Sequence, residues 1–170
     1  MQPKRITPIL CLLAASSFGC ASTATVPETY AFLPTQFNLP QERPNITVRI
    51  PDYLRQAGLV VQTGSNQLRA ANHHLWAEPL EQGIVRVIES ELKGNGDRLG
   101  IDRLEISVIQ FHGTIDGEVR LLAYWRAGDK QGQFSETTRQ SEDGMGAMVN
   151  AQGELLEALA RSVQLSLNPD

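Results

Sequence analysis

Apolar and polar residues alternate along three stretches of the chain, which is the pattern of strands with one buried face. These stretches are 45–50 (Ile46, Val48 and Ile50 apolar), 104–108 (Leu104, Ile106 and Val108) and 119–126 (Val119, Leu121, Ala123 and Trp125). Asp116-Gly117 lies between the last two and predicts a hairpin turn, because glycine readily adopts a positive φ. A loop at 128–132 predicts a further strand around Gln133 to Arg139, which gives an antiparallel meander.

The first half of the chain predicts shorter extended segments. Tyr30–Pro34 combines aromatic and apolar residues with a closing proline, which suits a short edge strand. Residues 59–63 form another strand candidate, and 64–67 supplies turn residues before a short segment at 68–70. His73 and His74 then fall in a loop ahead of the first helix.

Two other stretches carry apolar residues at every third or fourth position, which predicts amphipathic helices. The first is expected to begin near Trp76 to Glu78, because Pro79 is tolerated only in a first turn, and Gly94 and Gly96 are placed to end it. The second runs from about Gly146 to Leu165. The element order predicts an α+β domain with a mixed, largely antiparallel sheet and both helices packed on one face. The apolar positions are Trp76, Leu80, Ile84, Val87, Ile88 and Leu92 in the first helix, and Val149, Leu155, Leu156, Leu159 and Val163 in the second.

Catalytic and metal-binding patterns are missing from the sequence. A zinc site needs three or four spaced ligands, and His73, His74 and His112 are more simply solvated or strand-edge histidines. There is no G-x-S-x-G element for a serine nucleophile. Neighbouring acids such as Glu89 and Glu91 are typical of a solvated face. We therefore expect no enzyme, no cofactor and no metal.

Length and charge narrow the classes of partner. The 170 residues suit one domain with appendages, and the formal net charge is −4. An acidic body argues against nucleic acid, whose phosphates are bound by clustered Lys and Arg.

The N-terminal residues predict export. Lys4 and Arg5 precede an uncharged, mostly apolar run from Ile6 to Phe18, which has the length of a signal-peptide core and is too short to span a bilayer. Ser17-Phe18-Gly19-Cys20 resembles the lipobox of bacterial lipoproteins, with Ser17 in place of the usual leucine. This pattern predicts cleavage after residue 19 and acylation of Cys20.

A conventional secreted protein is the alternative, with Cys20 merely a small residue near the cleavage site. The cysteine count favours the lipid, because loss of Cys11 with the signal would leave Cys20 without a disulfide partner. Ala21 and Ser22 follow, where an aspartate often retains such proteins in the inner membrane. We expect a signal at 1–19, a lipidated tether at 20–29 and a folded domain at 30–170, at the periplasmic face of an outer membrane.

Leu122 and Tyr124 are candidates for a subunit contact. They alternate with Trp125 along one strand, so they face away from the helices. An apolar pair on that uncovered face is typical of a contact surface. Trp125 and Trp76, in contrast, are expected in the core.

Several segments resemble the ABC-type transport auxiliary lipoprotein family. They are the lipobox, Tyr30 to Pro34, Val48-Arg-Ile-Pro-Asp-Tyr-Leu54, Val60-Val61 and Trp76-Ala-Glu-Pro-Leu80. The chain departs from the family pattern at Arg55 to Ala57 and at Leu75. The resemblance covers nearly the whole chain after the signal, in order and in length.

This resemblance implies a fold similar to the N-terminal domain of TolB. It also implies a non-enzymatic outer-membrane lipoprotein that works with an MCE-domain protein and an inner-membrane permease in lipid transport across the envelope. Related proteins are thought to assemble into rings, so we expect a homo-oligomer. Asp52, Tyr53 and Leu54, in the segment 52–56, are further candidates for partner contact. The alternatives are a periplasmic solute- or cell-wall-binding lipoprotein and, more remotely, an envelope hydrolase.

Overall fold

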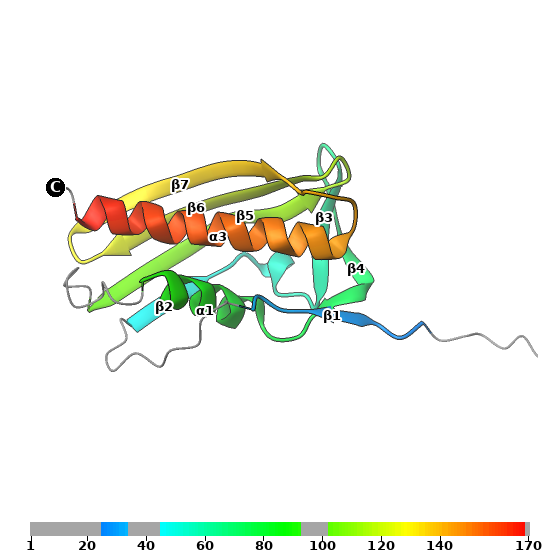
Figure 1. Ribbon diagram of the computed structural model, residues 1–170, viewed down its shortest axis with the longest axis horizontal. Coiled ribbons are helices and arrows are strands. Elements are labelled where there is room, and N and C mark those ends of the chain that lie inside the picture. The colour runs from blue at the N-terminus through cyan, green and yellow to red at the C-terminus, as the bar shows by residue number, and fades with distance from the viewer. Residues whose placement is uncertain (1–24, 34–44, 93–101, 169–170) are drawn as a thin grey trace, which may run out of the picture.

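In the part of the chain that the structure describes, a mixed sheet of seven strands has two helices against one of its faces (Figure 1). The computed structural model describes residues 25–33, 45–92 and 102–168. In chain order the elements are β1 (Glu28–Tyr30), β2 (Asn45–Arg49), the 3-10 turn η1 (Asp52–Leu54), β3 (Gly58–Gly64), β4 (Gln67–Trp76), α1 (Leu80–Leu92), β5 (Arg103–Thr114), β6 (Glu118–Ala127), β7 (Lys130–Arg139) and α3 (Met145–Leu167).

The meander β5-β6-β7 forms the long half of the sheet. Both its pairings are antiparallel, and Gly117 in the β5–β6 turn has φ 78°, so the predicted hairpin is confirmed. β7 begins at Lys130 instead of Gln133, because Ala127 pairs directly with Lys130 across a two-residue turn. A short turn lets more residues enter the ladder.

β2 and β3 meet β5 along the edge that does not pair with β6, whereas β4 pairs with β3 and β1 pairs with β4. β2 runs parallel to the first part of β5, and β3 runs parallel to its last two residues, so one strand follows the other along the same edge. η1 connects them. β5 has a bulge between Val108 and Gln110, between the stretches that pair with β2 and with β3. A bulge bends a strand and redirects its side chains, which matters for the site below.

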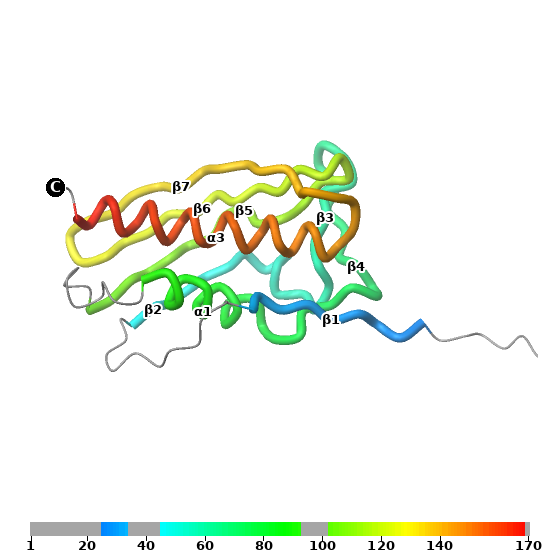
Figure 2. Tube along the Cα trace, in the orientation of Figure 1, coloured from blue at the N-terminus to red at the C-terminus, as the bar shows by residue number. Residues whose placement is uncertain are grey.

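The core lies between the helices and the meander. α3 packs on β5, β6 and β7, and α1 packs on β2 and on α3. The tube in Figure 2 shows the two helices side by side on the same face. The predicted α+β class, with its largely antiparallel sheet and both helices on one face, is confirmed. Fully buried members of this core include Ile84, Ile88, Leu104, Ile106, Phe111, Leu121, Leu156 and Leu159.

The end of α3 is tied to the sheet. Lys130 Nζ donates hydrogen bonds to the carbonyl oxygens of Ser166 at 3.3 Å and Leu167 at 2.9 Å. Such carbonyls lack partners within a helix, and a cation there also suits the helix dipole. A residue of the β6–β7 turn region therefore caps the last turn of the C-terminal helix.

The predicted start of the first helix was wrong. Trp76 is the last residue of β4: its N–H donates to the Ala57 carbonyl at 2.7 Å, and it pairs with Tyr30 of β1. α1 begins four residues later, at Leu80, with Pro79 just before it. The spacing of Trp76 and Leu80 matches a helix, although a strand ends between them. Gly94 and Gly96, the expected helix end, lie outside the described residues.

The histidine assignments also need correction. His73 and His74 belong to β4, which is a ten-residue strand and not a short segment at 68–70. β4 shows no clean alternation because its register with β3 shifts between the Gly58 and Val60 pairs. His112 is neither solvated nor at a strand end; it lies within β5 and is 5% exposed.

The N-terminal segment crosses from the sheet edge into the core. The predicted edge strand exists, but it spans 28–30 and starts two residues before the expected domain boundary. Phe32 then leaves the strand and is 5% exposed, with its ring centroid 5.1 Å from that of Trp76 and 6.2 Å from that of Phe111. Aromatic packing thus fixes the residues that directly follow the predicted tether.

Candidate functional site

The sheet face without helices carries ordered rows of polar side chains. Residues paired across strands share a face, so the register defines each row. The pairings join β2, β5, β6 and β7 in register. One row is Arg49, Ser107, Tyr124 and Gln133, and the next is Thr47, Glu105, Arg126 and Gln131. Residues far apart in sequence therefore meet at one place, and Tyr124 is among them.

These rows form an open groove of about 590 Å³, called here the sheet-face groove. Tyr124 is 48% exposed within it. Because the side chains stand on four paired strands, the groove is held by backbone hydrogen bonds and needs no rearrangement to form. Its lining consists of Arg49, Glu105, Ser107, Tyr124, Trp125, Arg126, Gln131, Gly132 and Gln133.

The charge of the sheet-face groove is positive. Glu105 forms an ion pair with Arg103, with Nη2 and Oε1 2.9 Å apart. In the part of the chain that the structure describes, Arg49 and Arg126 form no ion pair. Two guanidinium groups are therefore available for carboxylates or phosphates, which they bind through planar arrays of donors.

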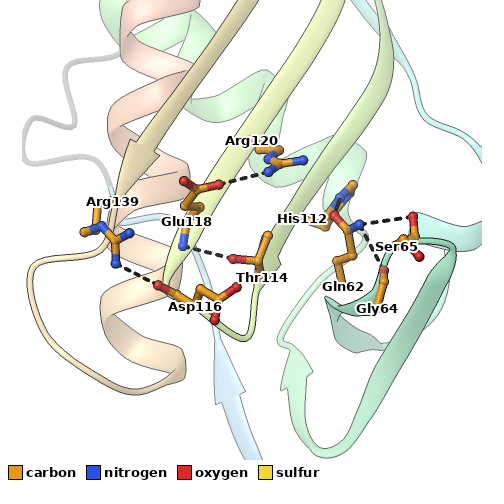
Figure 3. Close-up of polar contacts among 9 residues, drawn as sticks. All are labelled: Gln62, Gly64, Ser65, His112, Thr114, Asp116, Glu118, Arg120 and Arg139. Atoms are coloured by element: carbon orange, nitrogen blue, oxygen red, sulfur yellow. Dashed lines mark hydrogen bonds and ion pairs between the residues drawn. The ribbon is translucent and has the colours of Figure 1, made fainter.

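A second polar cluster lies on the same face, at the bulge of β5 (Figure 3). After the bulge, His112 pairs with Arg120 and points away from the helices, while Phe111 beside it stays in the core. His112 Nε2 lies 3.4 Å from Gln62 Oε1, and its Nδ1 lies 3.4 Å from the Tyr53 hydroxyl. η1 and β3 thus cover the imidazole.

Hydrogen bonding fixes the direction of the Gln62 amide. Its Nε2 donates to the Gly64 carbonyl at 3.0 Å, which turns Oε1 toward His112. The imidazole is then a neutral ring that donates from Nε2 to Gln62, while its Nδ1 and the Ile109 carbonyl each lie 3.4 Å from the Tyr53 hydroxyl, which has one proton to donate. Burial, and secondly the positive charge of Arg120, lower the pKa of His112. Burial also raises the pKa of Tyr53, so both groups stay neutral near pH 7.

The bonds around this cluster stabilise the end of the meander. Figure 3 shows the Arg120–Glu118 and Arg139–Asp116 contacts. Arg120 Nη2 lies 2.9 Å from Glu118 Oε2, and Arg139 donates to the Asp116 carbonyl at 2.8 Å. The pKa of Glu118 is lowered chiefly by its hydrogen bond from Arg120. These contacts are on the surface, so each contributes little to stability.

A third cluster fastens β1 to β4. The Tyr30 hydroxyl donates to Glu28 Oε2 at 2.5 Å and lies 3.2 Å from His74 Nδ1. The pKa of Glu28 is lowered, chiefly by the hydrogen bond from Tyr30, and that same bond raises the pKa of Tyr30. The cluster joins the first described strand to the domain, at the point where the predicted tether ends.

The helix layer has an open groove of about 330 Å³ between α1 and α3, called here the helix-layer groove. Phe32, Val87 and Val149 form a buried apolar floor. Glu91 and Glu157 share Arg161, whose Nη1 lies 3.6 Å from a carboxylate oxygen of each. The full lining is Ala31, Phe32, Leu33, Val87, Ser90, Glu91, Val149, Asn150, Gly153, Glu154 and Glu157.

The residues predicted to contact a partner differ in their exposure to solvent. Tyr124 lines the sheet-face groove, and Leu122 is partly exposed on the same face. Asp52 is exposed, with 97% of its side chain in solvent. Leu54 is only 2% exposed, so it belongs to the core and cannot serve as a surface contact. Cys20 lies outside the described residues.

Sequence reasoning missed the partners of Tyr124. Alternation along 119–126 places Arg126 and Tyr124 on one face, and this signal was available. The contributions of Arg49, Ser107 and Gln133 depend on strand register, which a single sequence does not give. Within the described residues, no three His, Cys, Asp or Glu side chains gather as a metal site, and no helix has the length and apolarity to cross a membrane.

These observations define a small α+β domain with an open polar groove on the sheet and an open groove with an apolar floor between the helices. The chain belongs to the ABC-type transport auxiliary lipoprotein component family, whose model matches residues 46–164. It is similar to the intermembrane transport lipoprotein PqiC of Escherichia coli K12 and to that of Shigella flexneri. Identity to each is 34% over 116 residues, 60% of this chain and 62% of the relative. The match therefore spans less than two thirds of those relatives.

Two solved structures share the fold. The crystal structure of an uncharacterized protein aligns with a TM-score of 0.68 at 22% identity, over 84% of this chain and 99% of the other. A Xanthomonas campestris protein of the DUF330 family aligns with a TM-score of 0.58 at 15% identity, over 82% and 95%. At these identities the likeness supports the α+β architecture and nothing further.

Proposed function

We propose that this protein is a non-enzymatic auxiliary component of an MCE-type intermembrane lipid transport system, anchored by a lipid on Cys20 to the periplasmic face of the outer membrane. Membership of the transport auxiliary lipoprotein family carries this proposal. The name of the PqiC relatives, intermembrane transport lipoprotein, supports the same role. The partners would be an MCE-domain protein, an inner-membrane permease and further copies of this chain.

The proposed anchor keeps the domain close to the membrane. We assign 1–19 as the signal, 20–29 as the lipidated tether and 30–170 as the domain, with β1 starting at Glu28. The eight peptide links between Cys20 and Glu28 span at most about 28 Å when fully extended. Two or three acyl chains on one residue hold stably, because each buried methylene adds about 0.8 kcal/mol. The domain would therefore work next to the bilayer.

Fractionation of a Cys20→Ala variant tests the anchor. The full-length variant should move from the outer-membrane fraction to the soluble periplasm, since its other cysteine lies in the signal. Cys11→Ala is the matched control and should leave the protein in the outer membrane. If the Cys20→Ala protein stays in the outer-membrane fraction, the lipoprotein assignment fails.

Co-purification tests the transport role. Detergent-solubilised, tagged protein should recover an MCE-domain protein from the envelope, identified by mass spectrometry. The recovery should survive Cys11→Ala. A protein that recovers no MCE-domain partner and instead holds a small molecule tightly would support the solute-binding alternative and reject the auxiliary role.

A further inference from the structure

The sheet-face groove and the helix-layer groove lie on opposite sides of the domain. The helices cover one face of the sheet (Figure 1). The residue rows of the sheet-face groove stand on the other face. The helix-layer groove opens between α1 and α3, over a buried floor of Val87 and Val149. Each copy of the protein therefore presents two different surfaces in opposite directions.

The two grooves have opposite charge. In the sheet-face groove Arg103 neutralises Glu105, which leaves Arg49 and Arg126 and a net charge of +2. In the helix-layer groove three carboxylates, Glu91, Glu154 and Glu157, are opposed by Arg161, for a net charge of −2.

We propose that the sheet-face groove of one copy binds the helix-layer groove of a second copy, head to tail. This inference rests on the proposed homo-oligomer and names the surfaces that form it. Arg49 and Arg126 meet the unpaired Glu154 and its neighbours, while Tyr124 lies over the apolar floor. Tyrosine and arginine are the side chains that most often dominate protein interfaces.

Like-charge repulsion disfavours the symmetric pairings. Two sheet-face grooves placed together would oppose arginines, and two helix-layer grooves would oppose carboxylates. Only the unlike pair is complementary. Small ligands are a poorer match for the sheet-face groove, because they favour enclosed, mostly apolar sites, whereas this groove is open and polar.

A head-to-tail contact repeats. Each copy keeps one unused groove, so further copies add until a ring closes or a filament extends. Anchors in one membrane hold the copies in one layer and raise their local concentration, which strengthens a weak contact.

Complementary charge reversals test the contact. The full-length lipoprotein is produced with two different tags, purified in detergent, and assayed by pull-down of one tag through the other and by light scattering. The wild type should give mixed-tag complexes above monomer mass. Arg126→Glu alone, or Glu154→Arg alone, should raise the dissociation constant about a hundredfold.

Co-expression of the two variants provides the decisive test of the contact. The intact sheet-face groove of Glu154→Arg meets the intact helix-layer groove of Arg126→Glu. Where the two substituted grooves meet, the exchanged charges at positions 126 and 154 are again opposite. Mixed-tag complexes should therefore return, while same-tag complexes stay rare. Arg69→Glu and Glu142→Arg make the same charge changes at exposed sites outside both grooves and should keep the wild-type mass.

A monomeric wild type, unchanged assembly in the single variants, or no rescue on co-expression would each overturn the head-to-tail contact. None of these results changes the membrane fraction of the protein or its recovery of an MCE-domain partner. Failure of this interface is thus distinguishable from failure of the proposed transport role.

Discussion

The two faces of the sheet use the same strands for different purposes. Along β6 the helix-covered side carries buried residues such as Leu121 and Trp125, and the open side carries Tyr124 and Arg126. Alternation along a strand sends neighbouring residues to opposite environments. One face therefore supplies stability through burial, and the other supplies a surface whose residues are free to meet a partner.

Among the described residues, each face carries one buried polar side chain that departs from this division. On the helix-covered side, Gln152 of α3 is 2% exposed, and its Oε1 has no hydrogen-bond partner among the described residues. On the open side, His112 is 5% exposed beneath Tyr53 and Gln62. Whether a side chain is buried thus depends on what packs over it, because a segment such as η1 can cover part of the open face.

Truncation in the helix layer should have the largest effect. Leu156 is fully buried, and Leu156→Ala should lower the free energy of unfolding by about 2–5 kcal/mol, through lost burial and the cavity left behind. Tyr124→Ala on the open face is the comparison and should change it by under about 1 kcal/mol. Urea unfolding followed by circular dichroism measures both. Equal losses would contradict the division of the two faces.

The sequence predicts that division well where periodicity is clean. The strands 104–108 and 119–126 and the buried stripe of the last helix follow from alternation and from the helical period. The prediction for β4 was wrong because a register shift breaks the alternation along this strand. The prediction for Trp76 was wrong because its spacing to Leu80 matches that of a helix. Local pattern cannot tell these cases apart.

The candidate site was predictable only in part. Tyr124 follows from the face it shares with Leu122. Arg49 and Gln133 join it through pairing across four strands, and pairing depends on long-range contacts that one sequence does not encode visibly. His112 is buried by η1 and β3 after the β5 bulge, so its environment also depends on tertiary structure.

The backbone at Gly132 lies close to the Trp125 ring on the helix-covered side, and substitution of Gly132 should give the next largest effect. A Cβ atom there would lie 2.7 Å from ring carbons of Trp125. Gly132→Ala should therefore lower the free energy of unfolding by about 1–3 kcal/mol, through displacement of the indole. In the Trp125→Leu background the same change should cost less, since the ring is gone. A double-mutant cycle by urea unfolding measures the coupling, and additive losses would rule out this contact.

Replacement of Gln152, the buried polar residue on the helix-covered side, should stabilise the protein. A buried carbonyl without a partner carries the cost of its lost hydration. Gln152→Met keeps a similar shape without that group and should raise the free energy of unfolding by about 1 kcal/mol. Gln164→Met, at a partly exposed position of the same helix, controls for the change in helix propensity. A loss of stability in Gln152→Met would mean that the amide has a partner.

His112, the buried polar residue on the open face, should make stability depend on pH. The folded-state pKa of His112 is lowered from its ordinary value of about 6.5, first by burial and then by Arg120. Below about pH 6.5 the unfolded chain therefore binds a proton that the folded chain does not. The contribution of the neutral ring is complete above that pH and is lost as the pH falls toward the folded-state pKa.

Comparison with His112→Gln isolates this group from the other titrating residues. Tyr53 of η1, Gln62 of β3, and Arg120 with its partner Glu118 on β6 face the imidazole, and they remain in the variant. Between pH 7 and 5 the wild type should lose stability faster than the variant, by at most about 1.4 kcal/mol per pH unit for one proton. Parallel pH profiles would mean that His112 is solvated, and that η1 does not extend burial onto the open face.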